Sequence, residues 1–185
     1  MSDEPVHDPE CEVAHGDTPY VTDGGRDLVA VYASPVAAYL LTWARELGFT
    51  TSLLEPDPDR LSDDLRNAAM RVYTDPGDVE VAATTDVVVT DHHRDDLGTM
   101  MAPLVTATPR WIGIMGSPRH TGPHIAALRA EGVTEDLIAT VHRPIGLDIG
   151  SKDPAEIALS TLAGLLAHRS GREGGFHRAA APAEA

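Results

Sequence analysis

The sequence has one cysteine, one lysine and no long hydrophobic run. Cys11 is the single cysteine in 185 residues, which excludes an internal disulfide and any CxxC metal or redox motif. No stretch approaches about 18 consecutive apolar residues, so we expect no membrane-spanning helix. The first residues lack the basic and apolar regions of a signal peptide. The sequence therefore favours a cytoplasmic location.

Positive charge is scarce, and the positive charge that is present is almost all arginine. Lys152 stands beside 13 arginines, against 18 aspartates and 11 glutamates, for a net charge of −15. Nucleic acids and anionic membranes both require a basic footprint, so the charge argues against either partner. Dispersed aspartate with little lysine is typical of a halophile protein that stays soluble in high salt. The alternative is a merely acidic protein from a GC-rich genome.

The chain divides into a body and two tails. Residues 1–26 carry seven acidic groups and one arginine among several prolines and glycines, so we expect an acidic disordered tail. Residues 170–185, rich in Gly, Ala and Pro, are expected to form a second disordered tail. The body spans residues 27–169, a length suited to one domain.

Short apolar runs alternate with amphipathic segments along the body. We expect strands over 28–32, 50–54, 70–73, 85–90 and 110–115, and a final extended strand near 144–150. We expect helices over 35–47, 61–68, 95–105, 123–131, 135–140 and 154–168. Such alternation predicts an α/β fold with a Rossmann-like, doubly wound parallel sheet in three layers, α/β/α. Ligands of such sheets bind outside the carboxyl ends of the strands.

The loop after the first strand differs from a dinucleotide-binding turn. Such turns use glycines so that the backbone can approach the pyrophosphate. Here the residues are Tyr32-Ala33-Ser34-Pro35, in which proline removes a donor and tyrosine would crowd a phosphate. Glu55 follows the second strand, where an acid would hold a ribose hydroxyl, although a solvated acid is equally consistent.

The loop after the 110–115 strand is better equipped for an anion. Gly116 lets a ligand approach the backbone, and Ser117 can cap the next helix and offer a hydroxyl. Arg119 supplies a fixed positive charge for a phosphate. The alternative is a well-capped turn with a surface arginine. His120 and His124 are four residues apart, but Gly122-Pro123 interrupts them and no third ligand is evident, so no metal site is predicted.

Two further segments are candidates for the same edge of the sheet. His92 and His93 follow Asp91 and could transfer protons, although adjacent side chains usually point to different sides. Residues 144–150 place Asp148 between two glycines, which fits an extended strand with a buried or pocket-facing carboxylate. The alternative for this segment is a tight structural connection. Neither segment identifies a catalytic residue.

Four segments together resemble the C-terminal Rossmann domain of the XdhC/CoxI family of xanthine dehydrogenase accessory factors. They lie at 111–117, 131–133, 141–151 and 154–158, and the resemblance extends over about 27–169. It implies binding of the molybdenum cofactor, a molybdopterin with a terminal phosphate. It also implies help with sulfuration of that cofactor and its insertion into a molybdenum hydroxylase. The implied partners are the hydroxylase apoenzyme, a cysteine desulfurase and a second copy of the chain in a homodimer.

The sequence departs from the family pattern at several positions. The family's Gly-Ala-Gly-His turn is replaced by residues 32–35, and Thr90 is followed by Asp91 before His92. The basic run after Gly-Ser is reduced to one arginine, and residues 1–26 do not resemble the family's cysteine-containing N-terminal domain. The cofactor-binding residues that we predict are Ser34, Glu55, His92, Gly116, Ser117, Arg119 and Asp148.

Two other functions remain open at this point. Fold analogy alone suggests an NAD(P)-dependent oxidoreductase, which would require the first turn to accept a pyrophosphate. A degenerate Rossmann module that only contacts a partner protein is the third reading. A non-catalytic accessory protein that binds the cofactor is the reading that the motifs favour.

Overall fold

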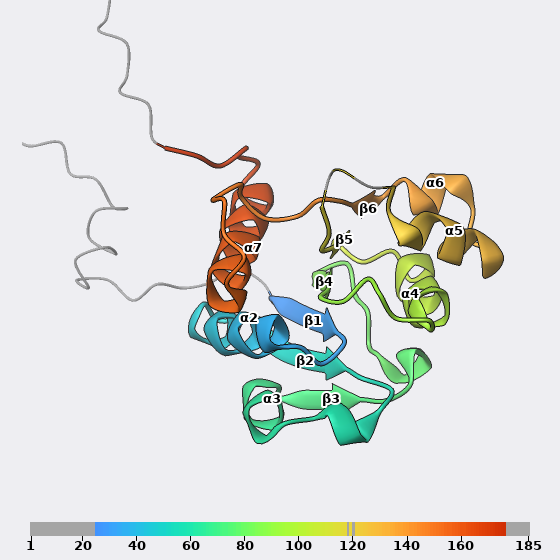
Figure 1. Cartoon of the computed structure of the whole chain (residues 1–185), viewed down its shortest axis with the longest axis horizontal. Coiled ribbons are helices and arrows are strands. Elements are labelled where there is room, and N and C mark those ends of the chain that lie inside the picture. Colours follow the sequence, from blue (N-terminus) through green and yellow to red (C-terminus); the bar gives the residue numbers. More distant parts are fainter. Residues whose placement is uncertain (1–24, 118, 120, 177–185) are drawn as a thin grey trace, which may run out of the picture.

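A computed structural model describes residues 25–117, 119 and 121–176 of the chain. Its helices and strands alternate along the sequence (Figure 1). The strands are β1 (Asp27–Val31), β2 (Thr50–Leu54), β3 (Arg71–Tyr73), β4 (Thr85–Val89), β5 (Trp111–Ile114) and β6 (Val141–His142). The helices are α2 (Pro35–Glu46), α3 (Asp63–Ala68), α4 (Leu97–Thr106), α5 (Pro123–Ala130), α6 (Glu135–Ile138) and α7 (Pro154–Arg169), with 3₁₀ turns η1 (Pro58–Arg60) and η2 (Pro76–Asp78).

The strands form one parallel sheet in the order β3-β2-β1-β4-β5-β6, which confirms the Rossmann-like fold. Helices α2, α3 and α7 cover one face, and α4, α5 and α6 cover the other (Figure 1). Alternation along β1 explains this division: Leu28 and Ala30 belong to the first core, and Val29 and Val31 to the second. Both faces of the sheet are therefore buried, as a parallel sheet requires.

Local signals in the sequence set most element boundaries. Helix α2 begins with a Ser34 cap and Pro35, and α7 begins with an Asp153 cap and Pro154. The C-terminal end of helix α7 is also bound to the sheet by an ion pair. Asp86 at the start of β4 is fully buried and accepts hydrogen bonds from Arg110 (2.5 Å) and from Arg169 of α7 (2.7 Å). This charge cluster lies at the amino end of the sheet and fixes the position of α7.

The predicted last strand is misplaced. The edge strand β6 is Val141–His142, whereas residues 144–150 form an irregular connection to α7. Gly146 has a φ of +84° and lies so close to Gly164 of α7 that a Cβ on Gly164 would be 3.1 Å from the Gly146 Cα. The backbone of this segment therefore packs on the helix, with Leu147 N–H donating to the Ser160 carbonyl, and does not extend the sheet. The structural connection was the better interpretation.

The predicted tails fall largely outside the described residues. Of the N-terminal one, only residues 25–26 are described, and of the C-terminal one, residues 170–176. Within the described part of the chain, no helix is both long and apolar enough to cross a membrane.

Candidate functional site at the carboxyl edge of the sheet

Loops follow the carboxyl ends of all six described parallel strands at one edge of the sheet. The sequence predicts the loops after β1, β2, β4 and β5, and two more loops follow β3 at Thr74 and β6 at Arg143. The edge has two parts that differ in character. The part at β1 and β2 is closed by side chains of the protein, and the part at β4, β5 and β6 carries cationic groups beside a cavity.

Glu55 closes the β1–β2 part of the edge. Its carboxylate is fully buried and accepts hydrogen bonds from the backbone N–H groups of Ala33 (2.8 Å) and Asp57 (3.0 Å). Both carboxylate oxygens also accept from the Arg94 guanidinium at 3.3 Å. These contacts use the carboxylate inside the protein, so Glu55 does not present itself to a ribose. Its position after β2 agrees with prediction, but its surroundings favour a structural role.

Tyr32 and Arg94 cover Glu55. Tyr32 has a φ of +76°, a left-handed conformation that glycine adopts more readily. Its fully buried ring lies under the Arg94 guanidinium, 4.6 Å from ring centroid to Cζ, and its hydroxyl donates to Asp96 at 3.0 Å. Burial, reinforced by the Asp96 carboxylate, raises the pKa of Tyr32. Side chains thus fill the turn where a dinucleotide fold places its pyrophosphate.

Ser34 is likewise engaged within the protein. Its hydroxyl caps α2 by accepting from Ala37 N–H at 3.0 Å, and it donates to Thr90 Oγ1 at 3.0 Å. Thr90 in turn donates to the β1-end carbonyl groups of Val31 and Tyr32. This network ties the loop after β1 to the loop after β4. Ser34 is therefore better explained as a structural residue than as a ligand contact.

Arg143 dominates the second part of the edge. It follows β6 directly, and its guanidinium lies against the chain at Gly116, after β5: a Cβ on Gly116 would be 2.6 Å from Nη2. Only glycine permits so close an approach, which gives Gly116 a definite reason to be glycine. The positive charge of Arg143 also extends to His92, whose pKa is lowered by burial, then by His93 and by Arg143.

The two adjacent histidines lie together, contrary to the expectation that they point to different sides. The ring centroids of His92 and His93 are 4.0 Å apart, and an Asx turn formed by Asp91 Oδ1 and His93 N–H shapes the loop. His92 is half-buried and His93 is exposed. His92 is therefore the better candidate of the two for a ligand contact.

A cavity of about 370 Å³ lies between α5, α6 and β6. Arg143 and His124 line it together with an apolar wall, and Arg129 and Glu135, joined by a bidentate ion pair, lie at its side. His124 is only 4% exposed, and its Nδ1 hydrogen-bonds to none of the described residues. Burial, and then the Arg143 charge, lower the pKa of His124, so the ring is neutral near pH 7.

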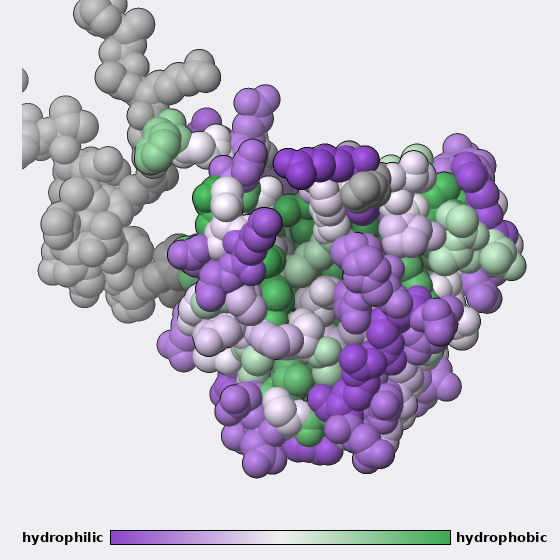
Figure 2. All heavy atoms as spheres, viewed as in Figure 1, coloured by the Kyte–Doolittle hydropathy of each residue, from purple (hydrophilic) through white to green (hydrophobic). Residues whose placement is uncertain are grey.

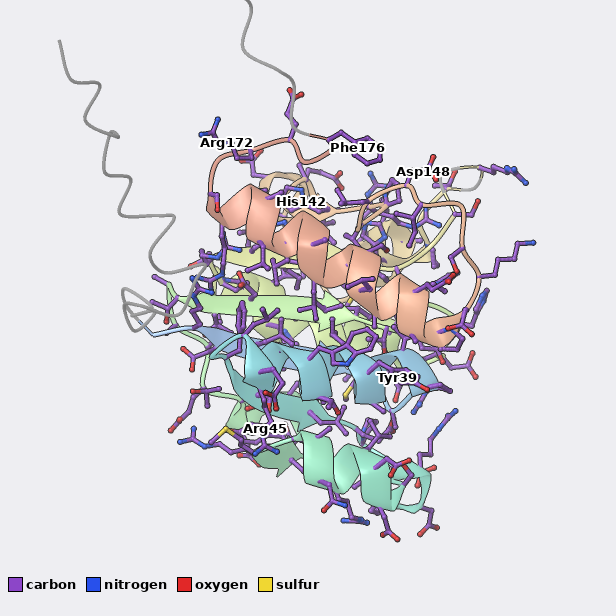
Figure 3. The ribbon with its side chains drawn as sticks, turned by 90° about the vertical axis from the view of Figure 1, so that its left-hand side faces the viewer. Tyr39, Arg45, His142, Asp148, Arg172 and Phe176 are labelled. Carbon is purple, nitrogen blue, oxygen red and sulfur yellow. The ribbon has the colours of Figure 1, made fainter. Side chains whose placement is uncertain are left out.

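The remaining predicted residues are peripheral to this cluster. Ser117 Oγ accepts from Arg119 N–H at 3.3 Å and does not cap α5, whose N-cap is Gly122 without a side-chain hydrogen bond. Arg119 is exposed. Asp148 is exposed as well, on the connection before α7 (Figure 3), and so is neither buried nor in a strand. His120 lies outside the described residues.

Sequence reasoning missed Arg143 and His124 as site residues. Arg143 could have been found from its place between a short strand and Pro144, within a segment that carries the family resemblance. His124 had a weaker signal, because only the three-dimensional structure shows that it is buried. In the described part of the chain, no group of three or more His, Cys, Asp or Glu side chains could hold a metal ion.

Comparison with known proteins decides the family. The family model described as the XdhC Rossmann domain matches residues 28–165, which is most of the chain. The chain belongs to the XdhC family. This match confirms the resemblance. One solved structure with the fold of this XdhC chain is described in the next paragraph.

Two relatives illustrate how much of a longer protein this XdhC chain spans. The uncharacterized protein YqeB of Escherichia coli K12 is 40% identical over 66 residues, which cover 36% of this chain and 12% of YqeB. A crystal structure described as a xanthine dehydrogenase from Bacillus halodurans has a TM-score of 0.65 at 24% identity, over 80% of this chain and 46% of that one. The chain thus spans less than half the length of either protein, and the second likeness establishes the fold alone.

Proposed function

We propose that this protein is an accessory factor in the maturation of a molybdenum hydroxylase and binds the molybdenum cofactor at the carboxyl edge of β4, β5 and β6. Membership of the XdhC family supports an accessory role in general. The observation that carries the cofactor proposal is the Arg143 guanidinium held against Gly116 at the strand ends. A cation beside a glycine turn suits an anionic, phosphate-bearing ligand.

The residues of this edge fit such a group. Arg143 supplies positive charge beside the glycine turn at Gly116, and Arg143 and His124 line the same cavity. His92 lies within the field of Arg143 and completes a cluster of imidazole and guanidinium groups. When bound, the cofactor would supply the molybdenum centre that the recipient hydroxylase uses. The residues of the chain would bind and orient it, without a catalytic step of their own.

The same geometry argues against an NAD(P)-dependent oxidoreductase. A dinucleotide needs an open first turn and an acid free to hold the ribose. Here Tyr32 fills the turn, and Arg94 and two backbone N–H groups engage Glu55. A binding module that contacts only a partner protein is the alternative that the experiment below addresses. The hydroxylase apoenzyme, a cysteine desulfurase and a second copy of the chain are the partners that we propose.

Purification from the native host in high salt tests the proposal. The protein is assayed for molybdenum and for fluorescent pterin oxidation products, beside the Arg143→Gln variant. Arg45→Gln is a matched control, because Arg45 lies on α2, where it donates to the Asn67 carbonyl (Figure 3). Near-stoichiometric pterin in the wild type and the control, lost in Arg143→Gln, is the expected result. Folded protein that carries neither molybdenum nor pterin, purified without a stripping step, would favour the protein-binding module.

A further inference from the structure

A groove of about 690 Å³ lies between α2 and the start of α3, beside the carboxyl ends of β1 and β2; we call it the α2–α3 groove. Its lining combines two aromatic side chains of α2, Tyr39 and Trp43, with two charged side chains that follow β2, Arg60 and Asp64. Buried Leu65 of α3 adds apolar surface. The α2–α3 groove shares no lining residue with the cavity between α5, α6 and β6, so it is a separate feature of the molecule.

The aromatic pair leaves ring surface open at the groove. Tyr39 is 44% exposed and Trp43 is half-buried, and their ring centroids are 5.4 Å apart with the planes inclined by 39°. Trp43 packs against the first core, which fixes its position, and Tyr39 lies on the face that α2 forms with α3 and α7 (Figure 3). Open aromatic rings beside a groove offer surface on which a flat ring can stack.

The fold does not use the two charged groups of the groove. Among the residues that the structure describes, none forms a hydrogen bond or an ion pair with the side chain of Arg60 or of Asp64. The neighbouring Arg66, in contrast, donates to the Pro58 carbonyl. A guanidinium supplies only donors and a carboxylate only acceptors, so the groove presents both to a ligand.

The charge around the groove disfavours an anionic ligand. Residues 56–66 carry four aspartates and two arginines, in a protein with a net charge of −15. The aspartates are Asp57, Asp59, Asp63 and Asp64. A phosphate beside this segment would be repelled, and the nearby turn after β1 is filled by Tyr32. The groove therefore suits an uncharged flat ring whose edges carry both donors and acceptors.

We propose that the α2–α3 groove binds an uncharged 2-amino-4-oxopyrimidine ring fused to a second ring, the ring system that guanine and oxidised pterins share. The ring stacks on Tyr39 and Trp43. Arg60 donates to the pair of acceptors on one edge, O6 and N7 in guanine, and Asp64 accepts from the ring N–H and the amino group on the other. Adenine has no ring N–H beside an amino group and fits less well. This inference does not rest on the proposed function, because it uses no residue of the β4–β5–β6 part.

Isothermal titration calorimetry with guanosine, adenosine, guanosine monophosphate and pterin tests the proposal. Guanosine should bind about tenfold or more tightly than adenosine, because only guanine satisfies both charged groups. Guanosine monophosphate should bind more weakly than guanosine, and added KCl should narrow that difference by screening the repulsion. Tryptophan fluorescence locates the ligand: Trp43 is half-buried and Trp111 only 7% exposed, so stacking in the groove should quench the emission of Trp43.

Three variants test the assigned contacts. Asp64→Asn should weaken guanosine binding by about tenfold and remove most of the preference over adenosine, since it removes a charged acceptor. Asp63→Asn is the matched control: Asp63 is the adjacent exposed carboxylate, does not line the groove, and should bind guanosine as the wild type does when changed. Tyr39→Ala should weaken guanosine binding by about tenfold or more through lost stacking. All three side chains are exposed, so circular dichroism should show folded protein in each case.

The outcomes separate this inference from the proposed function. Binding of neither guanosine nor pterin at about 1 mM would overturn the inference, and so would equal guanosine affinity in the wild type and Asp64→Asn. Binding of pterin without guanosine would support the ring assignment and identify a pterin as its source. Arg143→Gln should bind guanosine as the wild type does, so this titration and the assay for pterin from the native host can fail independently.

Discussion

The closure of the β1–β2 end by Glu55 has a measurable consequence for stability. Replacing Glu55 by alanine removes four hydrogen bonds at once: two from the backbone N–H groups of Ala33 and Asp57 and two from Arg94. It leaves the Arg94 guanidinium, whose side chain is 14% exposed, without its main partner. Asp96, 3.5 Å from Arg94, compensates in part.

The size of the loss follows from the burial of the pair. Breaking a buried ion pair by removing one partner costs about 3–5 kcal/mol, and the Asp96 contact places this case near the lower value. A loss of about 3 kcal/mol lowers the Tm of a domain of this size by about 6–12 °C. Urea denaturation followed by circular dichroism measures the free energy of unfolding directly.

Two further variants complete this experiment. Glu80→Ala removes the carboxylate of an exposed ion pair with Arg71 and should leave the unfolding midpoint unchanged. Replacing Glu55 by leucine and Arg94 by methionine together should recover much of the loss, because no buried charge is then left alone. A loss below about 1 kcal/mol for Glu55→Ala would refute the assigned structural role, since a single ordinary hydrogen bond accounts for that much.

Three other predictions concern the same edge of the sheet. Gly116→Val places a side chain on the Arg143 guanidinium, so the pterin content of the purified protein should fall and overpacking should cost about 1–3 kcal/mol in urea denaturation. Tyr32 should not ionise with the ordinary tyrosine pKa of about 10, so Tyr32→Phe should leave the ultraviolet titration of the folded protein near pH 10 unchanged. Because folding raises the pKa of Tyr32, the free energy of unfolding should fall as the pH rises above the pKa of this tyrosine in the unfolded chain. Stability should also fall as pH drops below about 6.5, because folding lowers the pKa of three histidines and the unfolded chain then binds more protons; pH-dependent urea midpoints measure this. These histidines are His92, His124 and His142.

The regular elements were predictable because their signals are local. The strand 50–54 and the start of α7 at Pro154 agree with the structure, since an apolar run or a cap followed by proline specifies each. The last strand was not predictable in this way. Val141–His142 is too short to give a periodic signal. Residues 144–150 look like a strand in sequence, but the close approach of Gly146 to Gly164 packs their backbone on α7.

Topology predicts where the loops of the candidate site lie, but not which of their side chains face a ligand. Topology alone locates the loops at 55, 92 and 116 at one edge, and the structure agrees. Whether a polar side chain faces a ligand or the protein depends on contacts that are remote in sequence. Glu55 meets Arg94, 39 residues away, and Ser34 meets Thr90, 56 residues away. No local pattern reports such pairings.

Hydrophobic residues on the face seen in Figure 2 reach the surface as scattered groups between hydrophilic ones. The two parts of the carboxyl edge differ in their role. Tyr32, Glu55 and Arg94 use the β1–β2 part to stabilise the fold, with their charges paired internally. The β4–β5–β6 part has a cavity that Arg143 and His124 line. Because the protein as a whole carries a charge of −15, affinity for an anionic ligand must come from a local positive group, and the Arg143→Gln variant should remove it.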